Sequence, residues 1–305
     1  MCALKSVEGL SKSLKVCWED GIAAQFSYLW LKDTALRPAL IHIDLNTKPE
    51  DLQIKKDILT VTWPRYTESS FTSKFLRRHI TKNPNNNLLI NKNIFNTPDH
   101  TPSESSYCPK ILNEKGCLIT SLRLAPKITP MGNFIWTGSM REPATVWPYL
   151  QQIPSLLSVE PINNQPGTLY LVDMYTALKI FQNEEPQLYN LLIDYPWVYR
   201  SGPFAAHHKL LNIQNGKIIS AIFNNDQRCS EIPMNEEFYL ALKKFGIIST
   251  KLMKVVKINP GQILFINNQT TLLGAPAEHN RIMKVCTFRE NFFFICHVLL
   301  SPLTL

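Results

Sequence analysis

The chain has 305 residues, of which 45% are hydrophobic and 18% charged, and it contains only 11 glycines. This composition excludes collagen-like, low-complexity and intrinsically disordered chains, because the apolar fraction is ordinary for a packed globule. The net charge is +8, but the Lys and Arg residues are scattered, which indicates a solvated basic surface rather than a nucleic-acid-binding protein.

The cysteines and the apolar runs bear on the compartment. Seven cysteines without a Cys-x-x-Cys pair argue against both a disulfide framework and a zinc ribbon, and they favour a reducing compartment. The longest strongly apolar run, residues 292–300, is far shorter than the roughly 20 residues of a membrane helix. The first residues lack the apolar core of a secretory signal. We therefore expect a cytoplasmic protein that does not contact membranes, with a mitochondrial location as the alternative.

The first 80 residues predict a small β-rich domain. Residues 14–18 and 57–63 alternate in polarity as half-buried strands do, and residues 73–80 predict a short helix. The following stretch is dominated by Asn, Pro, Ser and Thr, which is typical of a linker. The predicted organisation is a small N-terminal domain over 1–82, a linker over 83–110 and a larger domain over 111–305.

The larger domain combines strands with a few helices. Residues 173–181 and 185–194 carry apolar side chains at helical spacing. A third helix is expected to begin at Asn235 and to end at Gly246, a common C-cap residue. Predicted strands cover residues 217–223, 251–258, 262–266, 281–288 and 292–300. This pattern predicts a mainly β protein with helices, built on a β-barrel or jelly-roll core.

Six short segments resemble those of one enzyme family. They are WEDG (18–21), WLKD (30–33), VTWP (61–64), GTLYLVD (167–173), FNNDQR (223–228) and NPGQILFINN (259–268). In this order they resemble the gamma-butyrobetaine and trimethyllysine dioxygenases, which are TauD/TfdA-like iron(II)/2-oxoglutarate oxygenases. The resemblance implies a double-stranded β-helix with a small N-terminal domain, and a family that uses iron(II), 2-oxoglutarate and structural zinc.

The positions that match the iron ligands of this family carry aliphatic residues. The segment that corresponds to the family's His-x-Asp motif is REPATVWPYL (141–150), which places Ala144 at the histidine and Val146 at the aspartate. In NNQTTLLG (267–274), Leu273 stands at the distal histidine. Such enzymes hold iron through two histidines and one carboxylate. The expected catalytic set is therefore empty, and no metal or other cofactor is expected.

The zinc positions of the family are also changed. Its three cysteines correspond to Ala35, Arg37 and Leu40, and its histidine corresponds to Thr67. Zinc requires about four nitrogen, sulfur or oxygen ligands. We therefore expect the small domain to be stabilised by its own core, around the tryptophans of the three N-terminal motifs.

Histidines elsewhere offer no clear replacement. His42-Ile43-Asp44 is the only His-x-Asp sequence, and on a strand its two end residues share a face, but it lies outside the matching motif. His207 and His208 have no carboxylate at a useful spacing. We expect these side chains to be structural.

Five residues match binding positions of the family. Arg281 corresponds to the arginine that holds 2-oxoglutarate, and its alternative role is an ordinary salt bridge. Trp147 corresponds to an aromatic residue near the trimethylammonium group of the substrate, and its alternative is a core position. Asn224, Asn225 and Arg228 either line a pocket or cap the end of a strand.

The leading hypothesis is a catalytically inactive homologue, a pseudoenzyme. It would bind a small anion or a quaternary amine in the former pocket, or form a homodimer or a heterodimer with an active paralogue. The alternative is an active dioxygenase that hydroxylates a trimethylammonium substrate in carnitine biosynthesis, which would need iron ligands outside the matched motifs.

Overall fold

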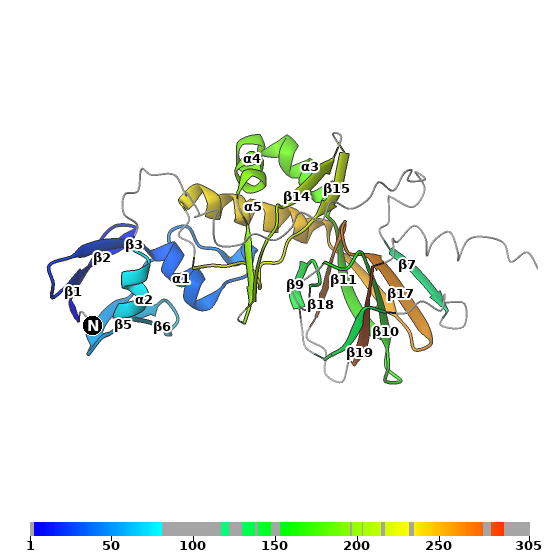
Figure 1. Ribbon diagram of the computed structural model, residues 1–305, viewed down its shortest axis with the longest axis horizontal. Helices are drawn as coiled ribbons and strands as arrows, with labels where there is room; N and C mark the ends of the chain where they lie inside the picture. Colours follow the sequence, from blue (N-terminus) through cyan, green and yellow to red (C-terminus); the bar gives the residue numbers. More distant parts are fainter. Residues whose placement is uncertain are drawn as a thin grey trace, which may run out of the picture. The chain divides into compact units, whose positions relative to one another are not determined.

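Figure 1 shows the computed structural model of the protein. The chain divides into two compact units. The described residues are 3–80, 117–121, 130–137, 140–147, 153–195, 197–202, 204–214, 217–231, 235–276 and 282–289. Unit 1 contains residues 3–38, 44–80 and 230–231, and unit 2 contains 39–43 together with the remaining described residues. The predicted linker over 83–110 lies outside the described residues. Residues 39–43, expected in the small domain, are part of unit 2.

Unit 1 contains two three-stranded antiparallel sheets and two helices. The first sheet is β1 (Leu4–Gly9), β2 (Ser13–Trp18) and β3 (Ala23–Ser27), and the second is β4 (Asp51–Lys55), β5 (Ile58–Trp63) and β6 (Thr67–Thr72). The helices are α1 (Tyr28–Leu36) and α2 (Ser73–Arg78). The two strands and the helix predicted in this region are confirmed, because their alternating apolar side chains face one core.

Three tryptophans form the centre of that core. Trp18, Trp30 and Trp63 are all buried in a single hydrophobic cluster. The indole of Trp18 donates a hydrogen bond to Ser73 Oγ at 2.9 Å, and that of Trp63 donates one to Ser69 Oγ at 2.8 Å. The predicted tryptophan core is confirmed, and these bonds satisfy two indole N–H groups that burial would otherwise leave unpaired.

Unit 2 is built on two larger antiparallel sheets. The five-stranded sheet has the order β7 (Cys117–Ser121), β17 (Gln262–Asn267), β10 (Leu156–Pro161), β19 (Met283–Phe288), β8 (Gly132–Trp136). The four-stranded sheet has the order β16 (Lys254–Ile258), β11 (Gly167–Asp173), β18 (Thr271–Ala275), β9 (Met140–Ala144). Strands alternate between the sheets from β8 to β11 and again from β16 to β19. Both sheets contribute to one apolar cluster, so the protein is mainly β with helices, as predicted.

Helices and hairpins complete unit 2. The helices are α3 (Met174–Glu184), α4 (Pro186–Asp194), α5 (Glu236–Leu252) and the short 3-10 turn η1 (Leu40–His42). The hairpins are β12 (Val198–Ser201) with β13 (Phe204–His207), and β14 (Leu211–Gln214) with β15 (Lys217–Ala221). Side chains cap two of the helices: Asp173 accepts from Tyr175 N–H, and Asn235, the predicted start of its helix, accepts from Phe238 N–H. Among the helices that the structure describes, none is both long and apolar enough to span a membrane.

The predicted end of α5 at Gly246 is wrong. The helix continues to Leu252, so residues 251–252, expected to begin a strand, are helical. Gly246 has a different role, because a Cβ atom built there would overlap Cβ of Leu40 and lie 3.3 Å from the backbone nitrogen of Ile41. The glycine thus permits close packing of η1 against α5 rather than terminating the helix.

Substitution of Gly246 by alanine is expected to destabilise the protein by up to about 2 kcal/mol. Alanine favours a helix interior by about 1 kcal/mol over glycine, but overpacking at a tight contact costs about 1–3 kcal/mol, and Cβ of Leu40 cannot rotate away. Urea denaturation followed by far-UV circular dichroism measures the difference. A higher unfolding midpoint for Gly246→Ala would contradict the contact between η1 and α5.

Candidate functional site

The end of β9 lies beside β18 in the four-stranded sheet of unit 2. Ala144 pairs directly with Leu273 in the antiparallel register, where opposite Cα atoms lie about 4.5–5.5 Å apart. The neighbouring Gly274 makes this approach possible, because a Cβ atom there would lie 2.9 Å from the Met140 carbonyl oxygen. Two residues that are 129 positions apart in sequence, both assigned by motif to iron-ligand positions, are therefore cross-strand neighbours.

Val146 joins the same region through a hydrogen-bonded clamp. Its N–H donates to Asn268 Oδ1 and its carbonyl accepts from Asn268 Nδ2, both at 2.9 Å. Asn268 Nδ2 also donates to the Pro154 carbonyl at 2.9 Å. Asn268 is fully buried, and its amide links three segments of backbone. The sequence patterns did not predict that Asn268 positions this backbone. The one sequence signal for this role is that Asn268 directly follows an apolar strand.

These three positions do not fit an iron ion. Ala144, Val146 and Leu273 are 3%, 5% and 0% exposed, and their side chains contain no nitrogen, oxygen or sulfur. Val146 and Leu273 belong to the apolar cluster between the two sheets. In the part of the chain that the structure describes, no group of three or more His, Cys, Asp or Glu side chains is arranged to hold a metal.

The positions matched to zinc ligands do not fit zinc either. Ala35 lies in the last turn of α1, and Arg37 caps this helix in the left-handed region with φ 44°. Arg37 Nη2 donates to Ser230 Oγ at 3.4 Å. Thr67 begins β6, whereas Leu40 is buried in unit 2, against the site of Gly246. None of these side chains is a thiolate or an imidazole.

The FNNDQR segment holds the backbone beside Ala144. Asn224 Nδ2 donates to the Thr145 carbonyl at 3.1 Å, and Phe223 N–H donates to Thr145 Oγ1 at 3.0 Å. Asn224 Oδ1 accepts from Gln227 N–H at 3.0 Å, which closes the turn of the segment itself. The side chain of Asn224 is buried. The amide of Asn224 therefore holds the backbone at Thr145 and Gln227.

A buried polar network extends from the same segment. Asn225 Nδ2 donates to Glu142 Oε2 at 2.8 Å, and Arg228 Nε donates to Asn225 Oδ1 at 3.1 Å. The other oxygen of Glu142 accepts from Leu40 N–H at 2.8 Å. Burial raises the pKa of Glu142, and these two hydrogen bonds and the nearby Arg228 oppose that rise. Glu142 was not among the predicted site residues, because an isolated glutamate in a strand carries no sequence signal.

Trp147 lies in an aromatic cluster. It is 2% exposed, and its ring packs edge-on against Tyr199 and His208, with centroids 5.4 and 4.5 Å apart. Its carbonyl accepts from Gln227 Nε2 at 3.1 Å. The Trp147 ring is therefore packed among aromatic side chains and buried. Arg281, the predicted 2-oxoglutarate ligand, lies outside the described residues.

The imidazole of His208 is expected to stay neutral down to about pH 4. Burial first, and then the neighbouring His207, lower its pKa from 6.5 to about 4. Between these pH values the unfolded chain takes up a proton that the folded protein does not bind, so stability should fall as the pH drops through this window.

An NMR titration tests this expectation. The imidazole resonance that disappears in His208→Gln should titrate with a midpoint near pH 4, and the variant should lose stability less steeply below pH 6.5 than the original chain. A midpoint above pH 6 would show that the ring is hydrated.

Comparison with known proteins shows a distant sequence similarity to one enzyme. No protein-family model matches the chain. It is 31% identical to trimethyllysine dioxygenase from Neurospora crassa over an alignment 136 positions long, which covers 39% of this chain and 28% of that protein. This similarity confirms the predicted resemblance over that region, and the match spans less than a third of the length of the enzyme.

Solved structures give weaker matches. Asparagine oxygenase is 13% identical with a TM-score of 0.38, covering 50% of this chain and 49% of its own. A taurine dioxygenase from Burkholderia xenovorans is 17% identical with a TM-score of 0.36, covering 57% and 64%. Both TM-scores are too low to establish a shared fold.

Proposed function

We propose that this distant homologue of trimethyllysine dioxygenase is catalytically inactive and works by binding another molecule. The observation that carries the proposal is the buried group of Ala144, Val146 and Leu273. Iron(II) in such oxygenases is held by two histidines and a carboxylate, and aliphatic side chains cannot coordinate it. The three positions lie together in the fold. An alignment error in one of the motifs would therefore not restore an iron site at this location.

The strand order supports a double-stranded β-helix as the framework. Eight strands alternate between two antiparallel sheets in two series, β8 to β11 and β16 to β19, as the strands of a jelly roll do. In this framework β9 and β18 are neighbours, and their pairing brings Ala144 opposite Leu273. The motif positions and the sheet topology therefore lead to the same location.

The packed interior favours binding through the outer surface. Val146, Leu171 and Leu273 are buried in one cluster with side chains of the facing sheet, and interiors packed in this way leave little room for a ligand. On the outside of unit 2, Phe204 and Val255 are exposed apolar side chains. We therefore favour a protein partner, either a second copy of this chain or an active paralogue of the dioxygenase, over a small molecule in the former pocket.

Metal content and turnover test the loss of catalysis. The purified full chain should contain less than stoichiometric iron and zinc after incubation with each metal and desalting. It should release no succinate above background from 2-oxoglutarate with trimethyllysine or gamma-butyrobetaine, while an active trimethyllysine dioxygenase assayed in parallel does. One iron per chain together with substrate-dependent succinate release would establish the alternative, an active dioxygenase.

A thermal-shift assay separates a retained anion pocket from a protein-binding surface. A ligand that binds only the folded state raises the unfolding temperature. We expect no rise with 2-oxoglutarate. If a rise occurs, is lost in Arg281→Ala and is kept in the control Arg289→Ala, whose side chain is exposed, the former pocket still binds anions.

A further inference from the structure

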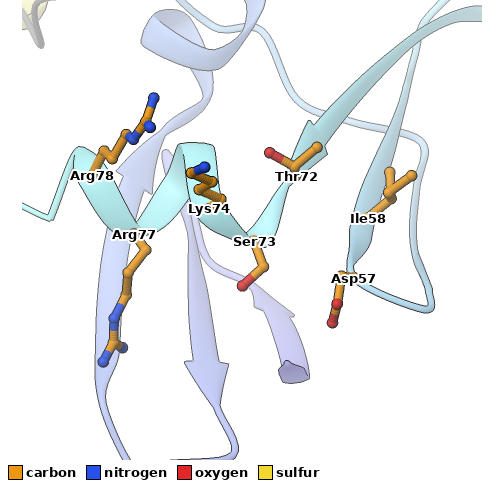
Figure 2. A pocket seen from close by; sticks show the side chains of 7 residues that line it. All are labelled: Asp57, Ile58, Thr72, Ser73, Lys74, Arg77 and Arg78. Carbon is orange, nitrogen blue, oxygen red and sulfur yellow. The ribbon is translucent and has the colours of Figure 1, made fainter. Parts of the chain in front are cut away.

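Unit 1 contains a cavity that is unrelated to the metal positions. Its volume is about 530 Å³, within the range of about 300–1,000 Å³ found for small-molecule sites. It is lined by Asp57, Ile58, Thr72, Ser73, Lys74, Arg77 and Arg78. Figure 2 shows these side chains along α2 and the adjoining ends of β5 and β6.

One end of the cavity is apolar. Ile58 is 41% exposed, although the next residues of β5 alternate into the tryptophan core. It pairs with Thr72 across the β5–β6 ladder, and the methyl group of this threonine extends the apolar surface. An exposed isoleucine inside a cavity of this size is a contact surface for an apolar group.

The other end is basic. The lining carries three positive charges, on Lys74, Arg77 and Arg78, and one carboxylate, on Asp57. Figure 2 shows the two arginines at the end opposite Asp57 and Ile58. Arg77 already forms an ion pair with Asp20, and its guanidinium lies 5.1 Å from the centre of the Trp18 ring. The side chains of Lys74 and Arg78 form no ion pair or hydrogen bond with any residue that the structure describes, so their charges are available to a ligand.

We propose that this cavity binds a small organic anion, with its apolar body against Ile58 and its carboxylate, sulfonate or phosphate group between Lys74 and Arg78. Burial of the apolar body supplies affinity, and the two cations select for negative charge. Arg77 is held by Asp20 and Trp18 and shapes the wall of the cavity. The site is independent of the proposed loss of catalysis.

A matched pair of fluorescent probes tests the proposal on the full chain. The anion is 8-anilino-1-naphthalenesulfonate, and the control is N-phenyl-1-naphthylamine, which has the same rings without the sulfonate. We expect the anion to bind more tightly than the neutral probe, and to bind more weakly in 0.5 M salt, where screening shortens the reach of surface charges.

Three variants locate the binding. Lys74→Ala/Arg78→Ala should weaken the anion about tenfold, since two exposed charge contacts are removed, and should leave the neutral probe unchanged. Lys5→Ala/Lys48→Ala makes the same change in net charge with exposed lysines of unit 1 away from the cavity, and should alter neither. Ile58→Thr should weaken both probes. Equal affinity for the two probes, or an unchanged anion affinity in Lys74→Ala/Arg78→Ala, would overturn the proposal.

Discussion

Val146→Asp is expected to lower the free energy of unfolding by about 4 kcal/mol, because it places a carboxyl group with no suitable partner in an apolar cluster. The substitution restores the residue type that the resemblance assigns to this position, so it tests whether the former ligand site is now dry. Urea denaturation followed by tryptophan fluorescence measures the change.

The matched control is Ile135→Asp, on the exposed side of β8. It introduces the same side chain into unit 2 and should cost less than about 1 kcal/mol, as surface substitutions usually do. If Val146→Asp lowered the free energy of unfolding no more than Ile135→Asp does, water would have to reach residue 146. That result would contradict a packed apolar interior at this position.

Arg228→Met is expected to destabilise the protein by about 3 kcal/mol, because it removes the donor to the buried Asn225 and a buried positive charge that stabilises the Glu142 carboxylate. Arg228 is 1% exposed and donates through Nε to Asn225, which in turn donates to Glu142. Methionine fills much of the space but removes the positive charge and the donor. The control Arg289→Met changes an exposed arginine and should have little effect.

The loss in Arg228→Met should depend on pH. The pKa of Glu142 is raised in the folded protein, so its ionisation costs stability as the pH rises from its unfolded value through its folded value. Arg228 lowers this pKa, and removing it enlarges the cost. The stability difference between the two proteins should therefore be larger at pH 7 than at pH 4.5, as measured by urea denaturation at each pH. A difference that is independent of pH would mean that Arg228 acts through packing alone.

Local patterns in the sequence predicted many elements of the fold. Alternation predicted β2 and β5, helical spacing predicted α3 and α4, and Asn235 predicted the start of α5, because these signals depend on residues within one or two turns. The end of α5 was wrong because Gly246 is explained by Leu40, some 200 residues away. A glycine that permits close packing and a glycine that ends a helix are identical in sequence.

The candidate site was predictable only in part. Motif order identified Ala144, Val146 and Leu273, and the structure brings these residues together. Glu142 and Asn268 were missed because their importance lies in partners distant in sequence, such as Leu40 and Pro154. The roles of Asn224 and Arg228 stayed open for the same reason, since a buried hydrogen bond and a ligand contact require the same polar side chains.

Residues 39–43 belong to unit 2 although residues on both sides of them belong to unit 1, and residues 230–231 belong to unit 1 although they follow a long stretch of unit 2. Neither unit is therefore one uninterrupted stretch of sequence. A fragment that starts after residue 82 would lack Leu40 and the surface that receives it on α5 would face solvent. Recombination or truncation at a single point therefore cannot yield an intact half. Expression of either unit alone therefore requires joining separate stretches of the sequence.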